Sequence, residues 1–189
     1  GKNAPPVAAA PAKSADSSST ANKKGPKPYG KVITDKAVSK QGLFTVHKVD
    51  DRWFFEIPDS LLNREMIVTT RYSKTAAGGG IYAGEIENNQ TILWEIGPNK
   101  NLFLRVVTTI SMADSSNEIY KAVTNSNLNP IAEVFEIKAF GKDSNTVVID
   151  VTDFFKGDNQ PIGLGAFSKK RFNLSNQVND RSYIQNINT

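Results

Sequence analysis

The sequence predicts a β-rich α+β fold of antiparallel sheets, with one or two short helices and a disordered N-terminal tail. After residue 30, apolar and polar residues alternate with a period of two along most of the chain, and helical spacing is rare. The strand-like runs are joined by short turns, which favours antiparallel pairing over βαβ units. The first 30 residues contain only two large apolar side chains, Val7 and Tyr29, too few to offset the entropy cost of ordering.

These patterns divide the chain into three parts. Residues 1–30 are expected to be a disordered tether, and residues 31–75 a small N-terminal β module. Residues 76–189 are expected to begin a second β-rich module. We expect this module to be truncated, because apolar content thins after residue 157 and no closing element follows.

Residues 31–40 are ambiguous, and Thr34 or Asp35 is a candidate cap for a short helix over Ala37 and Val38. A hairpin follows. Its two runs, 43–49 and 52–57, alternate with period two and are rich in aromatic and β-branched residues. The Asp-Asp pair between them is a plausible turn. The apolar face of the second run, expected to build the core, consists of Trp53, Phe55 and Ile57.

The remaining elements follow in order. Residues 59–63 suggest one helical turn, and residues 75–80 a loop of small residues that we expect to be mobile. Further strands are expected at residues 65–72, 81–86, 91–96, 102–110, 131–140 and 146–151. Turns are expected at residues 87–90, 97–101 and 141–143, and a short capped turn near residues 152–156.

The clearest helix is expected to open at residue 114 and run towards Leu128. Ser115 and Glu118 form a capping-box pattern, and Pro130 stops the helix.

The charge distribution disfavours nucleic-acid binding. The chain carries a net charge of +4, but residues 1–30 hold five lysines against the single acid Asp16. The rest of the chain is therefore neutral, whereas nucleic-acid binders usually concentrate positive charge on a folded face. No apolar stretch is long enough for a transmembrane helix. The tether composition and the start without Met fit an exported protein whose signal is already absent.

The residue types present do not predict a catalytic or metal site. The chain has no Cys and one His, whereas a zinc site normally needs three or four ligands. His47 on a strand is most often a cross-strand contact. Asp153 and Asp158 form a looser acidic cluster, where calcium binding is an alternative that we disfavour.

One face of the hairpin is a candidate docking or binding surface. Arg52, Phe54 and Glu56 share the face opposite Trp53, and Phe54 there is expected to be buried against a second layer or a partner. Tyr82 is a further candidate, since exposed aromatics stack on sugars or peptides.

Several segments resemble the N-terminal, non-catalytic part of bacterial exported zinc-dependent metallopeptidases of the met-zincin type. The first module carries the more specific likeness, in residues 27–34 and 42–65, which include the runs Gly42-Leu43-Phe44-Thr45-Val46 and Trp53-Phe54-Phe55-Glu56-Ile57-Pro58. Residues 127–131, 135–137 and 148–155 resemble the opening of that family's second module. The resemblance spans roughly residues 27–189.

The resemblance implies a role rather than a reaction. The family's catalytic centre is a His-Glu-x-x-His helix with a third His, and none of it lies in this chain. We therefore expect no catalytic residue, no metal ligand and no cofactor here, with zinc belonging to the parent protein. The implied role is a module or pro-segment that packs on or regulates the catalytic domain of the same polypeptide, in the periplasm or at the cell surface or outer membrane. The alternative is an independent glycan- or peptide-binding module that uses Phe54 or Tyr82.

Overall fold

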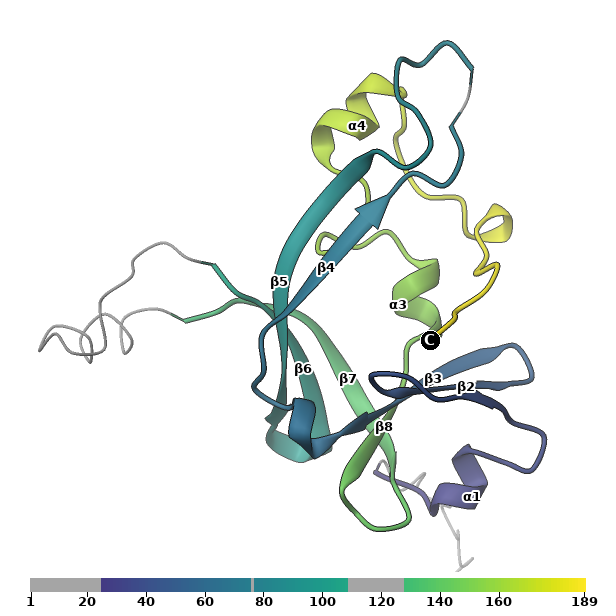
Figure 1. Ribbon diagram of the computed structural model, residues 1–189, viewed down its shortest axis with the longest axis vertical. Coiled ribbons are helices and arrows are strands. Elements are labelled where there is room, and N and C mark those ends of the chain that lie inside the picture. Colours follow the sequence, from purple (N-terminus) through teal and green to yellow (C-terminus); the bar gives the residue numbers. More distant parts are fainter. Residues whose placement is uncertain (1–24, 76, 109–127) are drawn as a thin grey trace, which may run out of the picture.

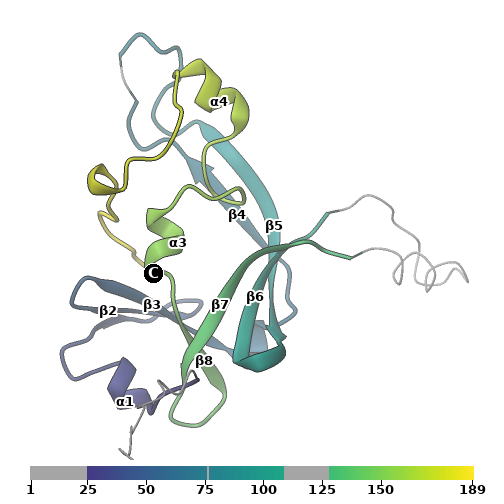
Figure 2. The same ribbon diagram turned by 180° about the vertical axis from the view of Figure 1, so that it is seen from behind.

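A computed structural model describes residues 25–75, 77–108 and 128–189. Eight antiparallel strands form one continuous curled sheet in the order β1-β2-β3-β8-β7-β6-β5-β4, as Figures 1 and 2 show. The strands are β1 (Val38–Lys40), β2 (Thr45–Val49), β3 (Arg52–Pro58), β4 (Met66–Arg71), β5 (Ile86–Gly97), β6 (Asn101–Val106), β7 (Ile131–Phe140) and β8 (Thr146–Asp150). The β-rich antiparallel fold predicted from the sequence is confirmed.

The helices of the described residues are short and lie around the sheet. They are α1 (Tyr29–Val32), α3 (Thr152–Lys156) and α4 (Ala166–Arg171), with 3-10 turns at Asp59–Leu61, Pro98–Lys100 and Asn179–Arg181. Figure 1 shows α3 inside the curl of the sheet and α1 on the opposite side of β2 and β3. Three register shifts, in the β4–β5, β6–β7 and β7–β8 pairs, interrupt the ladders. Such irregularities increase the local bend and twist of strands.

The core lies on the inner face of the curled sheet. It contains Trp53, Phe55 and Ile57, as the hairpin pattern predicted, together with residues of β5 to β8 such as Leu102 and Ile149. A smaller cluster lies on the outer face and contains Ile33, Phe54, Ala139 and Val148. Strand β3 is therefore covered on both faces.

The hairpin turn falls where the sequence placed it. Asp50 and Asp51 separate β2 from β3, and Asp50 adopts a positive φ of 51°. Because the loop has two residues, the register pairs Val49 with Arg52 and His47 with Phe54.

Four sequence predictions need correction. Residues 81–85, expected to belong to a strand at 81–86, lie in the loop between β4 and β5, and only Ile86 belongs to β5. Residues 34–38 do not form a helix; β1 pairs there with β2, because the exposed edge of the hairpin accepts a third strand. The expected tether extends too far, since Tyr29 lies in α1 and packs on the outer cluster. The turn expected at residues 87–90 is part of β5, whose polar Asn88 is held by carbonyl oxygens of Gln160 and Pro161. The helix expected over residues 114–128 falls almost wholly outside the described residues.

The last part of the chain crosses the open side of the curl. After α4, residues 172–189 run back to the β1–β2 turn, as the yellow trace in Figure 1 shows. There, Lys40 donates to Asn188 and the Thr189 hydroxyl donates to the Gln41 carbonyl. Ile184 and Ile187 pack against the core.

Truncation of a fully buried strand residue tests the core. Ile57→Ala should lower the free energy of unfolding by roughly 2–5 kcal/mol, because the vacated space cannot fully collapse. Ile86→Ala makes the same change at an exposed strand position and should stay within about 0.5 kcal/mol of the parent chain. Urea denaturation followed by circular dichroism measures both, and equal effects would contradict the assigned core.

The continuous sheet predicts one cooperative unfolding unit. Trp53 lies on β3 and Trp94 on β5, so each reports on a different part of the sheet. Unfolding curves followed by fluorescence in the single-tryptophan variants Trp53→Phe and Trp94→Phe should each coincide with the circular dichroism curve of the same variant. A fluorescence transition separate from that curve in either variant would show that the two parts unfold independently.

Candidate functional site

Glu56 is the hub of a polar network between the hairpin and its neighbours. Its carboxylate accepts hydrogen bonds from the Tyr29 hydroxyl at 2.7 Å and from the Thr146 hydroxyl at 2.7 Å. The Nε2 atom of His47 lies 2.9 Å from the same carboxylate, and its Nδ1 atom lies 2.7 Å from the Ser39 hydroxyl. The network thus joins α1, β1, β2, β3 and β8.

The position of His47 follows from the hairpin register. With a two-residue turn, Thr45 pairs with Glu56 and His47 pairs with Phe54, so His47 and Glu56 are diagonal neighbours on one face. His47 is buried and makes cross-strand contacts, as the sequence predicted. The sequence contained the signal for its pairing with Glu56, but it gave none for Tyr29, Ser39 or Thr146.

The hydroxyl, imidazole and carboxylate of this network are the groups that acyl-transfer enzymes use to activate a nucleophile. Here the carboxylate also accepts from Tyr29 and Thr146, and its side chain is only 15% exposed. Each of these contacts ties a neighbouring element to β3. We therefore interpret the network as structural: its hydrogen bonds hold the N-terminal segment on the sheet.

The electrostatics of Glu56 fit this interpretation. Burial disfavours its charged form, but hydrogen bonds from Thr146, Tyr29 and His47 outweigh burial and hold the pKa of Glu56 below its usual value. Burial, the hydrogen bond to Glu56 and the charge of Glu56 together raise the pKa of Tyr29 to about 12. The folded protein thus favours an ionised carboxylate beside a neutral phenol.

The candidate surface predicted from the sequence is only partly exposed. Phe54 is 8% exposed and packs with Ile33 on the outer cluster, and Glu56 lies in the network beneath Tyr29. Phe54 is thus buried against a second layer, as expected from the sequence, and that layer is the chain's own N-terminal segment. The same segment covers Glu56, so the face predicted for docking is not open at either residue. Tyr82, 73% exposed, lies on the loop between β4 and β5. Figure 1 shows this loop at the end of the molecule away from β2 and β3.

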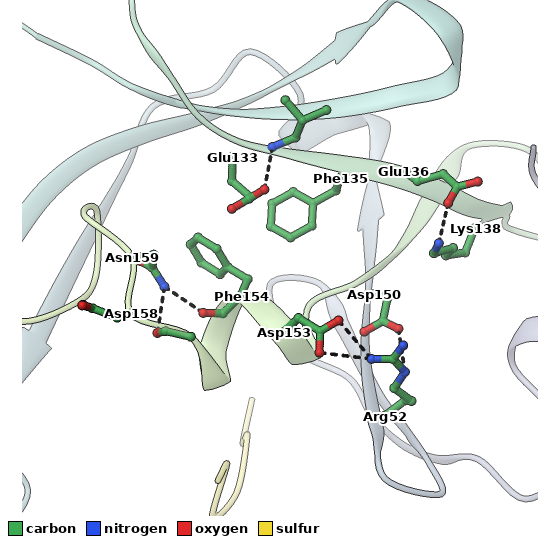
Figure 3. Close-up of a pocket in the computed structure, with 12 residues that line it drawn as sticks. Arg52, Glu133, Phe135, Glu136, Lys138, Asp150, Asp153, Phe154, Asp158 and Asn159 are labelled. Atoms are coloured by element: carbon green, nitrogen blue, oxygen red, sulfur yellow. Dashed lines mark hydrogen bonds and ion pairs between the residues drawn. The ribbon is translucent and has the colours of Figure 1, made fainter. Parts of the chain in front are cut away.

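Arg52 lies at a polar pocket of about 350 Å³ between β7, β8 and α3 (Figure 3). Its guanidinium contacts the carboxylates of Asp150 at 3.2 Å and Asp153 at 3.2 Å. Asp158, from the cluster weighed for calcium, lines the same pocket but pairs with Lys169 at 2.6 Å. Among the described residues, no three His, Cys, Asp or Glu side chains come together in a group that could hold a metal ion.

A second carboxylate anchors α4, and the sequence gave no sign of it. Glu87 on β5 accepts hydrogen bonds from the Tyr72 hydroxyl, from the Ser168 hydroxyl at 2.6 Å and from the Gly165 backbone at 2.7 Å. Burial opposes ionisation, but these bonds outweigh it and lower the pKa of Glu87. Strand β5 and the loops beside it therefore hold α4 in place.

The free energy of unfolding should fall at both ends of the pH range. The stability that ionised Glu56 contributes is fully present above the usual glutamate value of 4.5 and is lost as the pH falls through the lower folded-state pKa. The contribution of Tyr29 is present below pH 10 and is lost as the pH rises towards about 12, because the unfolded chain ionises first. Urea denaturation at a series of pH values measures both effects.

Three variants assign these effects to residues. Glu56→Gln should reduce the loss of unfolding free energy at acid pH. Tyr29→Phe should reduce the corresponding loss at alkaline pH. Tyr29→Phe should also cost roughly 1–2 kcal/mol at neutral pH, because Glu56 loses a donor. Glu65→Gln changes an exposed carboxylate and serves as the control. An acid loss as steep in Glu56→Gln as in the parent chain would contradict the role of Glu56.

Comparisons with known proteins place the chain in a family. None of the helices in the described ranges is both long and apolar enough to cross a membrane. No curated protein and no solved structure matches the sequence. Residues 26–75 match the domain of unknown function DUF5118, and residues 84–189 match the domain of unknown function DUF5117. The DUF5117 match covers more than half of this chain, which therefore belongs to the DUF5117 family. The DUF5118 match precedes it in the sequence.

Proposed function

We propose that this chain is a non-catalytic N-terminal region of an exported bacterial zinc-dependent metallopeptidase. In this role it packs on or regulates the catalytic domain of the same polypeptide. The resemblance of residues 27–34 and 42–65 to such enzymes supports the assignment. The zinc ion belongs to a His-Glu-x-x-His helix that is not in this sequence, so no residue of this chain takes part in the reaction.

The observation that carries the proposal is the apolar surface of the C-terminal third. From α3 to the last residue, the exposed large apolar side chains are Phe155, Phe167, Leu174, Val178 and Tyr183. Single exposed apolar residues are ordinary, but a concentration of them in one segment marks an interaction surface.

The catalytic domain is the partner that best fits this surface. Phe167 on α4 is 75% exposed and Tyr183 on the returning segment is 81% exposed. Both segments are fixed to the sheet, α4 by Glu87 and the returning segment by Gln41, so the side chains are presented on anchored backbone. Binding to anchored groups loses less conformational entropy than binding to mobile ones.

The proposal includes a cellular location for the protein, and an alternative binding role is weighed against it. Export to the periplasm or cell surface is supported by the Pro-, Ala-, Ser- and Lys-rich first 30 residues, which suit a tether. The alternative glycan- or peptide-binding role loses one of its two candidate aromatics, because Phe54 is buried. Tyr82 remains exposed.

A double variant tests the docking role in two lengths of polypeptide. Phe167→Ser with Tyr183→Ser should leave residues 1–189 within about 1 kcal/mol of the parent stability, since both side chains are exposed. In the longer polypeptide encoded by the same reading frame, the variant should lower the melting temperature or change peptidase activity. Hydrogen exchange should show residues 166–183 protected only in the longer chain.

Ile86→Ser supplies the control, because it removes an exposed apolar side chain outside the C-terminal third. It should have no effect in either length. Equal behaviour of the double variant and this control in the longer chain, with unchanged exchange over residues 166–183, would refute docking. A downstream sequence without His-Glu-x-x-His would refute the link to metallopeptidases.

A further inference from the structure

Strand β4 forms one edge of the sheet (Figure 1). It has six residues and contains neither Pro nor Lys, and its only charged residue is the last one, Arg71. Natural edge strands are usually very short or carry such residues, because a free edge pairs readily with another strand. The opposite edge strand, β1, has three residues. The edge at β4 is therefore the longer and less protected of the two.

The direction of the backbone groups of β4 follows from its pairing with β5. The Thr91 carbonyl accepts a hydrogen bond from the Val107 N–H at 2.8 Å, so the backbone groups of Thr91 face β6. Ile67 of β4 pairs with Thr91, and its own backbone groups therefore point away from β5. The same holds for every second residue, Thr69 and Arg71. Outside the sheet ladder, none of these backbone groups is hydrogen-bonded in the described part of the chain.

The side chains along this edge are complementary to a second copy of themselves. Glu65 precedes β4 and Arg71 ends it, and both are exposed. Glu65 has no hydrogen bond or ion pair with another described residue, and Arg71 uses one nitrogen to donate to the Gly84 carbonyl. Between the two charges lie Ile67, which is 74% exposed, and Thr69. With an acid at one end and a base at the other, an antiparallel copy brings opposite charges together.

We propose that β4 pairs antiparallel with β4 of a second copy of this chain, so that a two-fold axis joins the two sheets. In the register centred on Val68, Arg71 lies opposite Glu65 of the partner subunit, and Ile67 lies opposite Thr69 of the partner subunit. Opposite charges across an antiparallel pair stabilise it, and the two-fold axis makes each contact occur twice. Shifting the register by two residues in either direction separates these charges. This inference does not depend on the proposed docking role.

Charge reversal tests the pairing. Sedimentation velocity of residues 1–189 over a range of concentrations should show a monomer–dimer equilibrium that weakens as salt is raised. Arg71→Glu, and separately Glu65→Arg, should raise the dissociation constant of the dimer by about ten- to hundredfold, because two attractive pairs become repulsive. The double variant with both changes should return to within about threefold of the parent value, since opposite charges again face each other.

A single introduced Cys tests the register, because the chain has none of its own. In the proposed dimer, Val68 lies opposite its own copy in a non-hydrogen-bonded pair, where the Cα atoms are about 4.5 Å apart, within the range for a disulfide. Val68→Cys should therefore form a covalent dimer under mild oxidation. Met66→Cys is the matched control on the same face. Its two copies would lie four residues apart along the strands, roughly 13 Å, and should not cross-link.

Circular dichroism checks that each variant keeps the fold, and Phe167→Ser with Tyr183→Ser, which changes exposed side chains elsewhere, should leave the dimer intact. A parent chain that stays monomeric at every concentration would overturn the proposal. A dimer that neither charge reversal weakens, or that the double variant fails to restore, would place the interface elsewhere and overturn it as well. Slow hydrogen exchange of β4 found only in the longer polypeptide would instead assign this edge to another segment of that polypeptide.

Discussion

The antiparallel pairing of β3 with β8 is the contact on which the rest of the structure depends. It joins strands about 90 residues apart in the chain, with Phe55 opposite Ile149, and makes one sheet from segments that match two different family models. Since β3 also pairs with β2, it has a strand on each side and a layer on each face. Without this pairing, the first hairpin would have an open edge and half of its core would be exposed.

Two partly buried carboxylates fix the covering layers to this sheet. Glu56 holds α1 and β1 on one side, and Glu87 holds α4 on the other. Hydrogen bonds outweigh burial at both carboxylates, so each remains ionised and attracts its donors more strongly than a neutral acceptor would. The short helices have few residues with which to stabilise themselves, and such anchors compensate for that.

The exposed apolar side chains of the C-terminal part and the walls of an apolar cavity on the inner face of the sheet share one residue, Phe155. Exposed side chains such as Phe167 and Tyr183 lie on anchored segments outside the sheet, whereas Trp94 lines a cavity within its curl. Helix α3 connects these two regions, because it lines the cavity and the segment after it leads to α4. The Arg52 pocket is different again, since its charges pair with one another at the surface.

The sequence by itself determined the local structure: the period-two strands, the core face of β3, and a hairpin whose two-residue turn sets His47 beside Glu56. Side-chain alternation and turn chemistry act over a few residues and can be read directly. Only the tertiary structure decided which strand pairs with β3, that Tyr29 covers Glu56, and that the Trp94 indole N–H has no acceptor among the described residues. Those outcomes depend on contacts between residues far apart in the chain, which local periodicity does not encode.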